Sequence, residues 1–187
     1  QVNNCELVEF PEEIINLINL ENLNITTGME IPQNIGNLIN LQNLTIRGGK
    51  GTIPASMGNL TKLKVLDLGS SNYTGKIPIE LGNCRELRLL SLCCNNLEGK
   101  IPEELINCLK LEGLDLSDNE LSGEVPNFST CTELRDIDLS NNELSGVFPA
   151  DIFSMVNLNM LNLQNNQLKG NIPISVKSKQ FWEIGWG

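Results

Sequence analysis

The sequence predicts an α/β solenoid: a right-handed superhelix with a parallel β-sheet on its concave face and a mostly irregular or 3-10 convex side. Three observations predict this fold. A pattern of apolar residues returns at a nearly constant interval, and polar and apolar residues alternate over a short segment of every copy. The chain is also 40% hydrophobic but only 4% aromatic, so its core must be aliphatic. A fixed interval within about 20 to 50 residues is typical of stacked repeats.

Each repeat begins with an apolar residue, numbered position 0. Apolar residues follow at positions 3, 6 and 8, then Asn at 11, an apolar residue at 13, Gly at 15 and an apolar-Pro pair at 17 and 18. The clearest matches start 24, 24, 23 and 24 residues apart, at Leu60, Cys84, Cys108, Cys131 and Met155. The match at Leu60 has Ser71 in place of the Asn. About seven turns are expected over the whole chain.

The pattern within one repeat predicts local structure. Alternation around positions 6 and 8 predicts one short strand per turn, with positions 5, 7 and 9 pointing outward and strands stacked about 4.8 Å apart. We expect the Asn at position 11 to turn inward and satisfy backbone amides at the bend. Gly at position 15 permits a tight backbone, and the following Pro ends further pairing.

The phrases "ASMGNLTKLKVLDLGSSNYTGKIP" and "LGNCRELRLLSLCCNNLEGKIP" resemble the plant-type leucine-rich repeat. This subfamily includes receptor-kinase ectodomains, receptor-like proteins and polygalacturonase-inhibiting proteins, and the resemblance covers about residues 14 to 176. It implies a single domain over residues 1–187. Residues 1–16 are expected to form an N-terminal cap or partial repeat, 17–176 about seven repeats and 177–187 a C-terminal cap or tail.

The ends of the chain depart from the pattern. The segments "TTGME" (26–30) and "RGGKG" (47–51) replace the usual Asn-Leu-Gly segment, and a shortened arm is favoured over a ligand-binding loop. Plant-type ectodomains usually have paired cysteines in both caps, whereas Cys5 stands alone and none follows Cys131. We expect Phe181 and Trp182 to cover the apolar end instead.

The cysteines and the absence of His limit the possible chemistry. Cys84, Cys108 and Cys131 fall on position 0, where free Cys behaves as a small hydrophobe. The adjacent Cys93 and Cys94 leave open a vicinal disulfide or a reactive thiol. Because the chain has no His, neither a Ser-His or Cys-His dyad nor the usual zinc site can form. We therefore expect no enzyme activity, no cofactor and no metal.

Charge and hydropathy bear on two classes of partner, nucleic acid and membrane. The net charge is -10 with a pI of about 4.5, which argues against nucleic-acid binding. No apolar run approaches the roughly 18 residues that span a bilayer. The chain also begins without a basic and apolar leader, so Gln1 is expected to start a mature or trimmed form.

Two outward positions predict a binding surface on the concave sheet. Position 7 of successive repeats, called row 7, includes an acidic stripe, and position 4, called row 4, includes basic residues. Leucine-rich repeats commonly bind through this face, although a merely solvated face would have the same pattern. The candidate ligand-binding residues are Asp67, Ser91, Asp115, Asp138 and Asn162 from row 7 and Lys64, Arg88 and Arg135 from row 4.

Five Asn-x-Ser/Thr sequons favour the secretory route and a location outside the cell or on the extracellular side of the plasma membrane. The expected glycosylation sites are Asn24, Asn43, Asn59, Asn72 and Asn127. Asn24 lies in row 7, so a glycan there would block the N-terminal end of the concave face.

The resemblance implies a non-catalytic recognition module for a peptide or protein ligand, in the manner of a receptor ectodomain, with a basic secreted enzyme or a co-receptor as candidate partners. The alternative is a secreted inhibitor of a cell-wall-degrading hydrolase, because the acidic row would suit a basic enzyme. Ice binding, known for a plant relative of the fold, needs a regular row of like residues. The irregular position 14 argues against it, with residues Thr74, Glu98, Ser122, Ser145 and Lys169.

Overall fold

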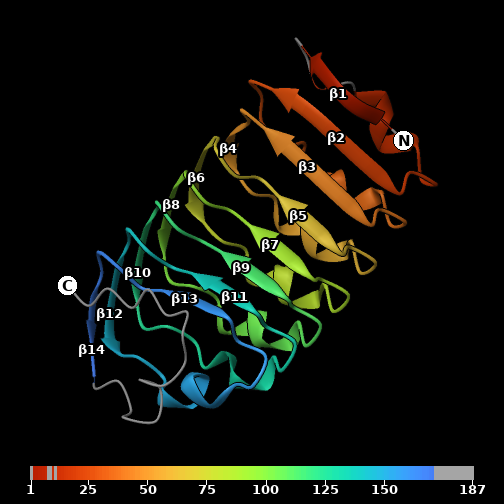
Figure 1. Ribbon diagram of the computed structural model, residues 1–187. Helices are drawn as coiled ribbons and strands as arrows, with labels where there is room; N and C mark the ends of the chain where they lie inside the picture. Colours follow the sequence, from red (N-terminus) through yellow and green to blue (C-terminus); the bar gives the residue numbers. More distant parts are fainter. Residues whose placement is uncertain (1, 8–9, 11, 171–187) are drawn as a thin grey trace.

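The computed structural model describes residues 2–7, 10 and 12–170 and confirms the solenoid. Its concave face is an eight-stranded parallel sheet to which each turn contributes one strand (Figure 1). Successive strands pair without crossovers, so residues at one repeat position form a row across the sheet. The strands are β1 (Val2–Leu7), β2 (Asn22–Thr27), β3 (Asn43–Arg47), β5 (Val65–Asp67), β7 (Leu89–Ser91), β9 (Gly113–Asp115), β11 (Asp136–Asp138) and β13 (Met160–Asn162).

A second parallel sheet, of six strands, follows the bend of each turn (Figure 1). The sequence pattern predicted only one strand per turn, so this sheet is an addition to the expected fold. It forms because positions 12 to 14 also alternate, with a buried residue such as Leu97 between exposed Asn96 and Glu98. Its strands are β4 (Lys50–Thr52), β6 (Asn72–Lys76), β8 (Asn96–Gly99), β10 (Glu120–Gly123), β12 (Glu143–Val147) and β14 (Gln167–Lys169).

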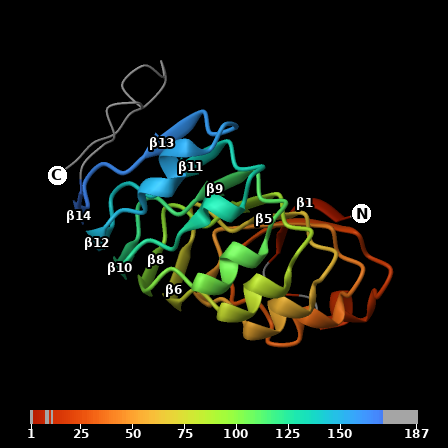
Figure 2. The ribbon, with the colours of Figure 1, turned by 90° about the horizontal axis from the view of Figure 1, so that it is seen from below.

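Short 3-10 helices line the convex side, as expected (Figure 2). Several begin directly after the Pro at position 18, whose extended backbone and missing N–H end the preceding strand pairing. They are η1 (Glu12–Asn16), η2 (Ile35–Asn37), η3 (Ala55–Asn59), η4 (Ile79–Asn83), η5 (Glu103–Asn107), η6 (Phe128–Thr130) and η7 (Ala150–Ser154).

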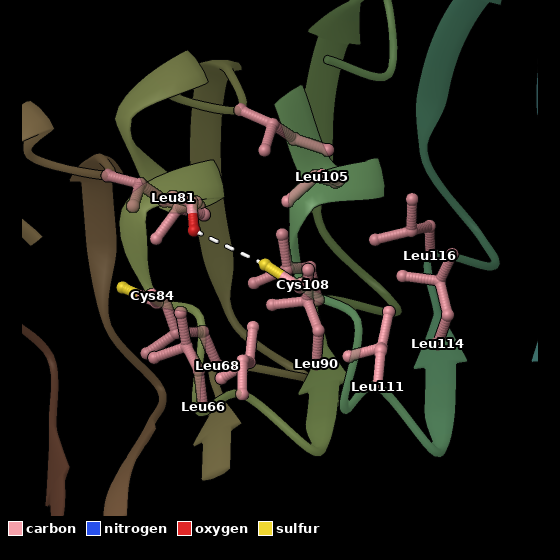
Figure 3. Packing of buried hydrophobic residues seen from close by; sticks show 14 of the residues in the cluster. Leu66, Leu68, Leu81, Cys84, Leu90, Leu105, Cys108, Leu111, Leu114 and Leu116 are labelled. Atoms are coloured by element: carbon pink, nitrogen blue, oxygen red, sulfur yellow. Dashed lines mark hydrogen bonds between the residues drawn. The ribbon is translucent and has the colours of Figure 1, made fainter. Parts of the chain in front are cut away.

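The core is a stack of leucine layers enclosed by the two sheets and the 3-10 helices (Figure 3). The prediction for the cysteines at position 0 is confirmed: Cys84, Cys108 and Cys131 are buried and free. Each thiol also donates to a carbonyl of the preceding turn, as Cys108 Sγ does to Leu81 O at 3.7 Å (Figure 3). These cysteines are therefore packing residues of the core.

The Asn at position 11 turns inward, as predicted, but it bonds mainly to carbonyls. Asn142 Nδ2 donates to the oxygens of Leu116, Leu139 and Ser140 at 3.0, 3.2 and 3.1 Å. Its Oδ1 accepts from the backbone N–H of Leu121, one turn earlier, at 3.0 Å. Asn95, Asn119 and Asn166 occupy the same repeat position and repeat this arrangement, so each one joins two turns.

The irregular second turn is a shortened arm that packs against the third. Lys50 of "RGGKG" begins β4 and bridges to Glu30, so the segment continues the second sheet. Tyr73, which stands where other repeats have Leu, is fully buried beside it. A Cβ placed on Gly49 would lie 2.0 Å from the Tyr73 hydroxyl oxygen, so the large ring occupies the space that the short arm leaves. The segment has a packing role. Residues 177–187, including Phe181 and Trp182, and the side chain of Cys5 lie outside the described part.

Candidate functional site

Row 7 forms a continuous line across the concave sheet. Strand pairing places Asp67 opposite Ser91, Ser91 opposite Asp115, and Asp115 opposite Asp138. Asp138 is in turn opposite Asn162. All five side chains are half-buried on the outer surface of the sheet. The structure therefore brings the five predicted row 7 residues together.

The aspartates of this row are held in fixed orientations. Asp115 Oδ1 accepts from the Ser117 backbone N–H at 3.1 Å and from Ser117 Oγ at 2.7 Å. Asp138 Oδ1 accepts from the same two groups of Ser140 at 2.9 and 2.6 Å. Only one oxygen of each carboxylate is used in this way. Asp138 Oδ2 accepts from Asn162 Nδ2 at 3.0 Å, and the Asp115 carboxylate interacts with the Cys93 thiol.

The basic residues of row 4 are less uniform. Lys64 Nζ donates to Gln42 Oε1 at 2.7 Å, and Arg88 forms an ion pair with Glu112. Arg135 is exposed and has no ion pair with the described residues. The predicted basic stripe is thus interrupted by neutral and acidic partners.

Position 5 of successive repeats, called row 5, also faces outward on the concave sheet beside row 7. Its central members are Val65, Leu89, Gly113, Asp136 and Met160, the first residue of each three-residue strand. Leu89 and Met160 are 40% and 39% exposed, and Asp136 is an exposed carboxylate on the strand that holds Asp138. The alternation that identified row 7 also points to row 5, so the signal was present.

Together, Asp115, Asp136 and Asp138 form an acidic patch on β9 and β11, called the concave acidic patch. The ion pairs among the residues that the structure describes join Arg47 to Asp67, Arg88 to Glu112 and Lys110 to Glu86, so none neutralises this patch. An exposed sheet with orientated carboxylates and neighbouring apolar side chains can bind a cationic, extended ligand.

The vicinal disulfide considered for Cys93 and Cys94 is wrong, because both thiols are free. Cys93 Sγ lies 3.6 Å from Ser91 Oγ in the concave sheet, and burial raises the pKa of this thiol to about 12. Its thiolate is therefore rare at neutral pH, which argues against a reactive role. Cys94 is exposed, with its Sγ 3.9 Å from Asp118 Oδ2.

Over residues 2–7, 10 and 12–170, no group of three or more Cys, Asp or Glu side chains is arranged to hold a metal ion. Within the same described part, no helix has the length and apolar character needed to cross a bilayer.

The five sequons occupy different surfaces. Asn24 on β2 and Asn43 on β3 lie on the concave sheet. Asn59 ends η3, Asn72 begins β6, and Asn127 precedes η6.

Solved structures that are similar to this chain include plant receptors and a plant ice-binding protein. The chain is 35% identical to the plant peptide hormone receptor RGFR1, solved in complex with RGF2, over 91% of this chain and 28% of that one, with a TM-score of 0.83. It is 32% identical to the ectodomain of the Arabidopsis receptor kinase HAESA in complex with an IDA peptide hormone, over 98% and 32% of the two chains, with a TM-score of 0.85. A plant ice-binding protein is 31% identical over 84% and 53%, with a TM-score of 0.72.

The chain spans about a quarter to a third of the length of the RGFR1, PEPR1 and HAESA structures that it matches. Among curated proteins, none matches the sequence. The profile of the leucine-rich repeat region matches residues 1–175. This chain therefore belongs to the leucine-rich repeat family and is a plant-type member of it.

Proposed function

We propose that this chain is a non-catalytic recognition module, secreted or on the extracellular side of the plasma membrane, whose concave sheet binds a cationic peptide or a cationic segment of a protein. The observation that carries the proposal is the concave acidic patch, in which Asp115 and Asp138 are orientated by Ser117 and Ser140. Groups that are already fixed lose little conformational freedom when a ligand binds, so preorganisation favours affinity.

The second sheet offers a useful contrast. Its outward residues Glu98, Glu120 and Glu143 are also acidic and exposed. Their carboxylates form no hydrogen bond with other described residues, and these longer side chains must be ordered when a ligand binds. Equal charge with less preorganisation makes this surface the weaker candidate and a matched control.

The expected ligand is extended because row 7 runs at right angles to the strands, with one side chain about every 4.8 Å. Lys or Arg side chains of the ligand would pair with the acidic patch. An apolar ligand residue would pack on Leu89, whose exposed side chain lies over Gly113 on the next strand. The receptors RGFR1 and HAESA were solved with peptide hormones bound, which supports a peptide as the ligand class.

The test is capture of secreted proteins and peptides from plant apoplastic fluid. The triple variant D115N/D136N/D138N is compared with wild type and with the control E98Q/E120Q/E143Q, which removes the same charge from the second sheet. We expect a basic ligand that wild type and the control retain and the concave variant loses. Equal loss from both variants, or no loss from either, would contradict the proposal.

Capture from fungal culture filtrate extends the test to the inhibitor alternative. A basic cell-wall hydrolase held through the same three aspartates would favour an inhibitor over a receptor-like module. Ice binding is not proposed, because the residues at position 14 on the second sheet differ in charge and size from turn to turn.

A further inference from the structure

The five sequons divide into two groups by the contacts of their side-chain amides. Asn24, Asn59 and Asn72 are exposed, and their amides form no hydrogen bond within the described part of the chain. The amides of Asn43 and Asn127 are both engaged with neighbours.

The engaged amides are held in different ways. Asn43 is half-buried on β3, and its Nδ2 donates to Asn22 Oδ1 on the adjacent strand. Asn127 Oδ1 accepts from the Ser129 backbone N–H at 3.2 Å and caps η6, and its Nδ2 donates to Asp151 Oδ2 at 3.0 Å.

N-glycosylation makes a demand on this same nitrogen. Asn Nδ2 attacks the anomeric carbon of a lipid-pyrophosphate-linked oligosaccharide. A new C–N bond forms, the lipid pyrophosphate leaves, and Nδ2 loses one of its two protons. The glycan is large and remains on the surface. An amide already seated against a neighbour has to move to accommodate it, whereas a free amide does not.

We propose that Asn24, Asn59 and Asn72 carry N-linked glycans in the secreted protein and that Asn43 and Asn127 do not. This inference rests on the proposed extracellular function. Asn59 and Asn72 lie outside the eight-stranded sheet, so glycans there leave the concave face open.

A glycan on Asn24, unlike those on Asn59 and Asn72, would lie on the concave face. Asn24 lies in row 7 on β2, near the N-terminal end of the sheet, whereas the concave acidic patch lies on β9 and β11 toward the other end (Figure 1). A glycan on Asn24 therefore covers the concave surface around β2 and β3. It leaves the strands from β5 to β13 open to the ligand, including β9 and β11, which carry Asp115, Asp136 and Asp138.

Site-resolved mass spectrometry tests the occupancy. The chain is secreted from plant cells behind a cleavable leader and treated in H₂¹⁸O with an amidase that converts glycan-bearing Asn to labelled Asp. We expect the label at Asn24, Asn59 and Asn72 only. Label at Asn43 or Asn127, or an unlabelled Asn24, would overturn the proposal.

Chemical modification tests whether a glycan on Asn24 covers the concave surface around β2 and β3. The side chain of Arg47 on β3 is 62% exposed, and Arg135 is an exposed arginine beside β11. We expect phenylglyoxal to modify Arg47 at least twofold faster in Asn24→Gln than in the glycosylated wild type, with Arg135 unchanged. Asn59→Gln is the matched control, since it removes a glycan elsewhere. If phenylglyoxal modifies Arg47 at the same rate in Asn24→Gln and in wild type, the glycan on Asn24 does not cover this surface.

The two proposals fail separately. The leader imposes the secretory route, so a bare Asn24 overturns the glycan proposal whatever the ligand is. Ligand capture by the wild-type concave face and by D115N/D136N/D138N is compared in an Asn24→Gln background, so its outcome does not depend on a glycan at Asn24.

Discussion

Single residues at two positions of the repeat connect neighbouring turns and shape the concave face. The Asn at position 11 holds carbonyls of two turns together, and the Asp at position 7 is held by the residue two places later. Both are polar groups whose hydrogen bonds determine their orientation, so their roles can be separated by substitutions that keep or remove an acceptor.

Asn142→Ala tests the connection between turns. It removes the Oδ1 acceptor of the buried Leu121 N–H and one of the donors to each of three carbonyls, which keep their other donors from Asn119, Asn166 and Asp118. We therefore expect a loss of about 2 kcal/mol in the free energy of unfolding. Denaturant unfolding measures it. Asn96→Ala, at an exposed position of β8, should change stability by less than about 0.5 kcal/mol. Equal effects would contradict the role of Asn142.

Asp115→Asn and Asp138→Asn test whether the carboxylate charge matters for folding. Asn162 already accepts from the Gln164 N–H through its Oδ1 at 3.2 Å, so Asn fits this position and keeps the acceptor. We expect the free energy of unfolding of the double variant to lie within about 1 kcal/mol of the wild-type value. Asp115→Ala/Asp138→Ala, which removes both acceptors, should be less stable than the Asn pair. If the Asn pair itself unfolds, the charges are structural, and loss of ligand binding could not be assigned to the site.

Within elements, the short second arm and Tyr73 fit each other. The prediction of a shortened arm came from the missing Asn-Leu-Gly segment, but the compensating ring could not be foreseen. Position 13 reads simply as apolar, and only the structure shows that the ring lies against Gly49. The second sheet was not predicted for a related reason, since three residues of alternation are too few to distinguish a strand from a turn.

Gly49→Ala tests this fit. Its Cβ would lie 2.0 Å from the Tyr73 hydroxyl oxygen, so we expect a loss of about 2 kcal/mol from overpacking. Adding Tyr73→Leu, the residue found at this position in β8, β10 and β12, removes the clash and should recover part of the loss. A double-mutant cycle, with the stability of wild type, the two single variants and the double variant measured by thermal unfolding, gives the coupling energy between residues 49 and 73. Additive effects would show that the two residues are independent.

The core of the whole molecule includes buried thiols. Their titration makes the free energy of unfolding depend on pH in the alkaline range. Burial raises the pKa of Cys84 to about 11 and that of Cys108 to about 12, from an ordinary value of 9.0. Between these values and 9.0 the unfolded chain has lost thiol protons that the folded chain retains, so stability decreases as pH rises. Below pH 9.0 this contribution is fully present.

The corresponding measurement is denaturant unfolding from pH 8 to 11 for wild type and Cys108→Ala. The variant should be less stable at pH 8, because it creates a cavity, but should lose less stability as pH rises. Parallel pH profiles for the two proteins would contradict a contribution from the Cys108 thiol.

At the scale of the molecule, the solenoid, its concave sheet and the alignment of row 7 could all be predicted, because a strict repeat converts sequence positions into rows in space. The state of the residues within a row could not. The pairing of Arg88 with Glu112 and the anchoring of Asp115 by Ser117 depend on side-chain orientation, which periodicity does not specify. The inward Asn was predicted, but one carbonyl partner of Asn142, Leu116 O, lies on the neighbouring turn, at a distance that the repeat pattern alone does not give.

The most direct test of the account is carboxylate footprinting of the chain with its captured ligand. A water-soluble carbodiimide and an amine label exposed carboxylates, and mass spectrometry gives the labelling of each residue with and without the ligand. The account predicts at least fivefold protection of Asp115, Asp136 and Asp138, with Glu98, Glu120 and Glu143 labelled equally in both states. Protection of the three glutamates with the aspartates still open would place the ligand on the second sheet and contradict the concave site.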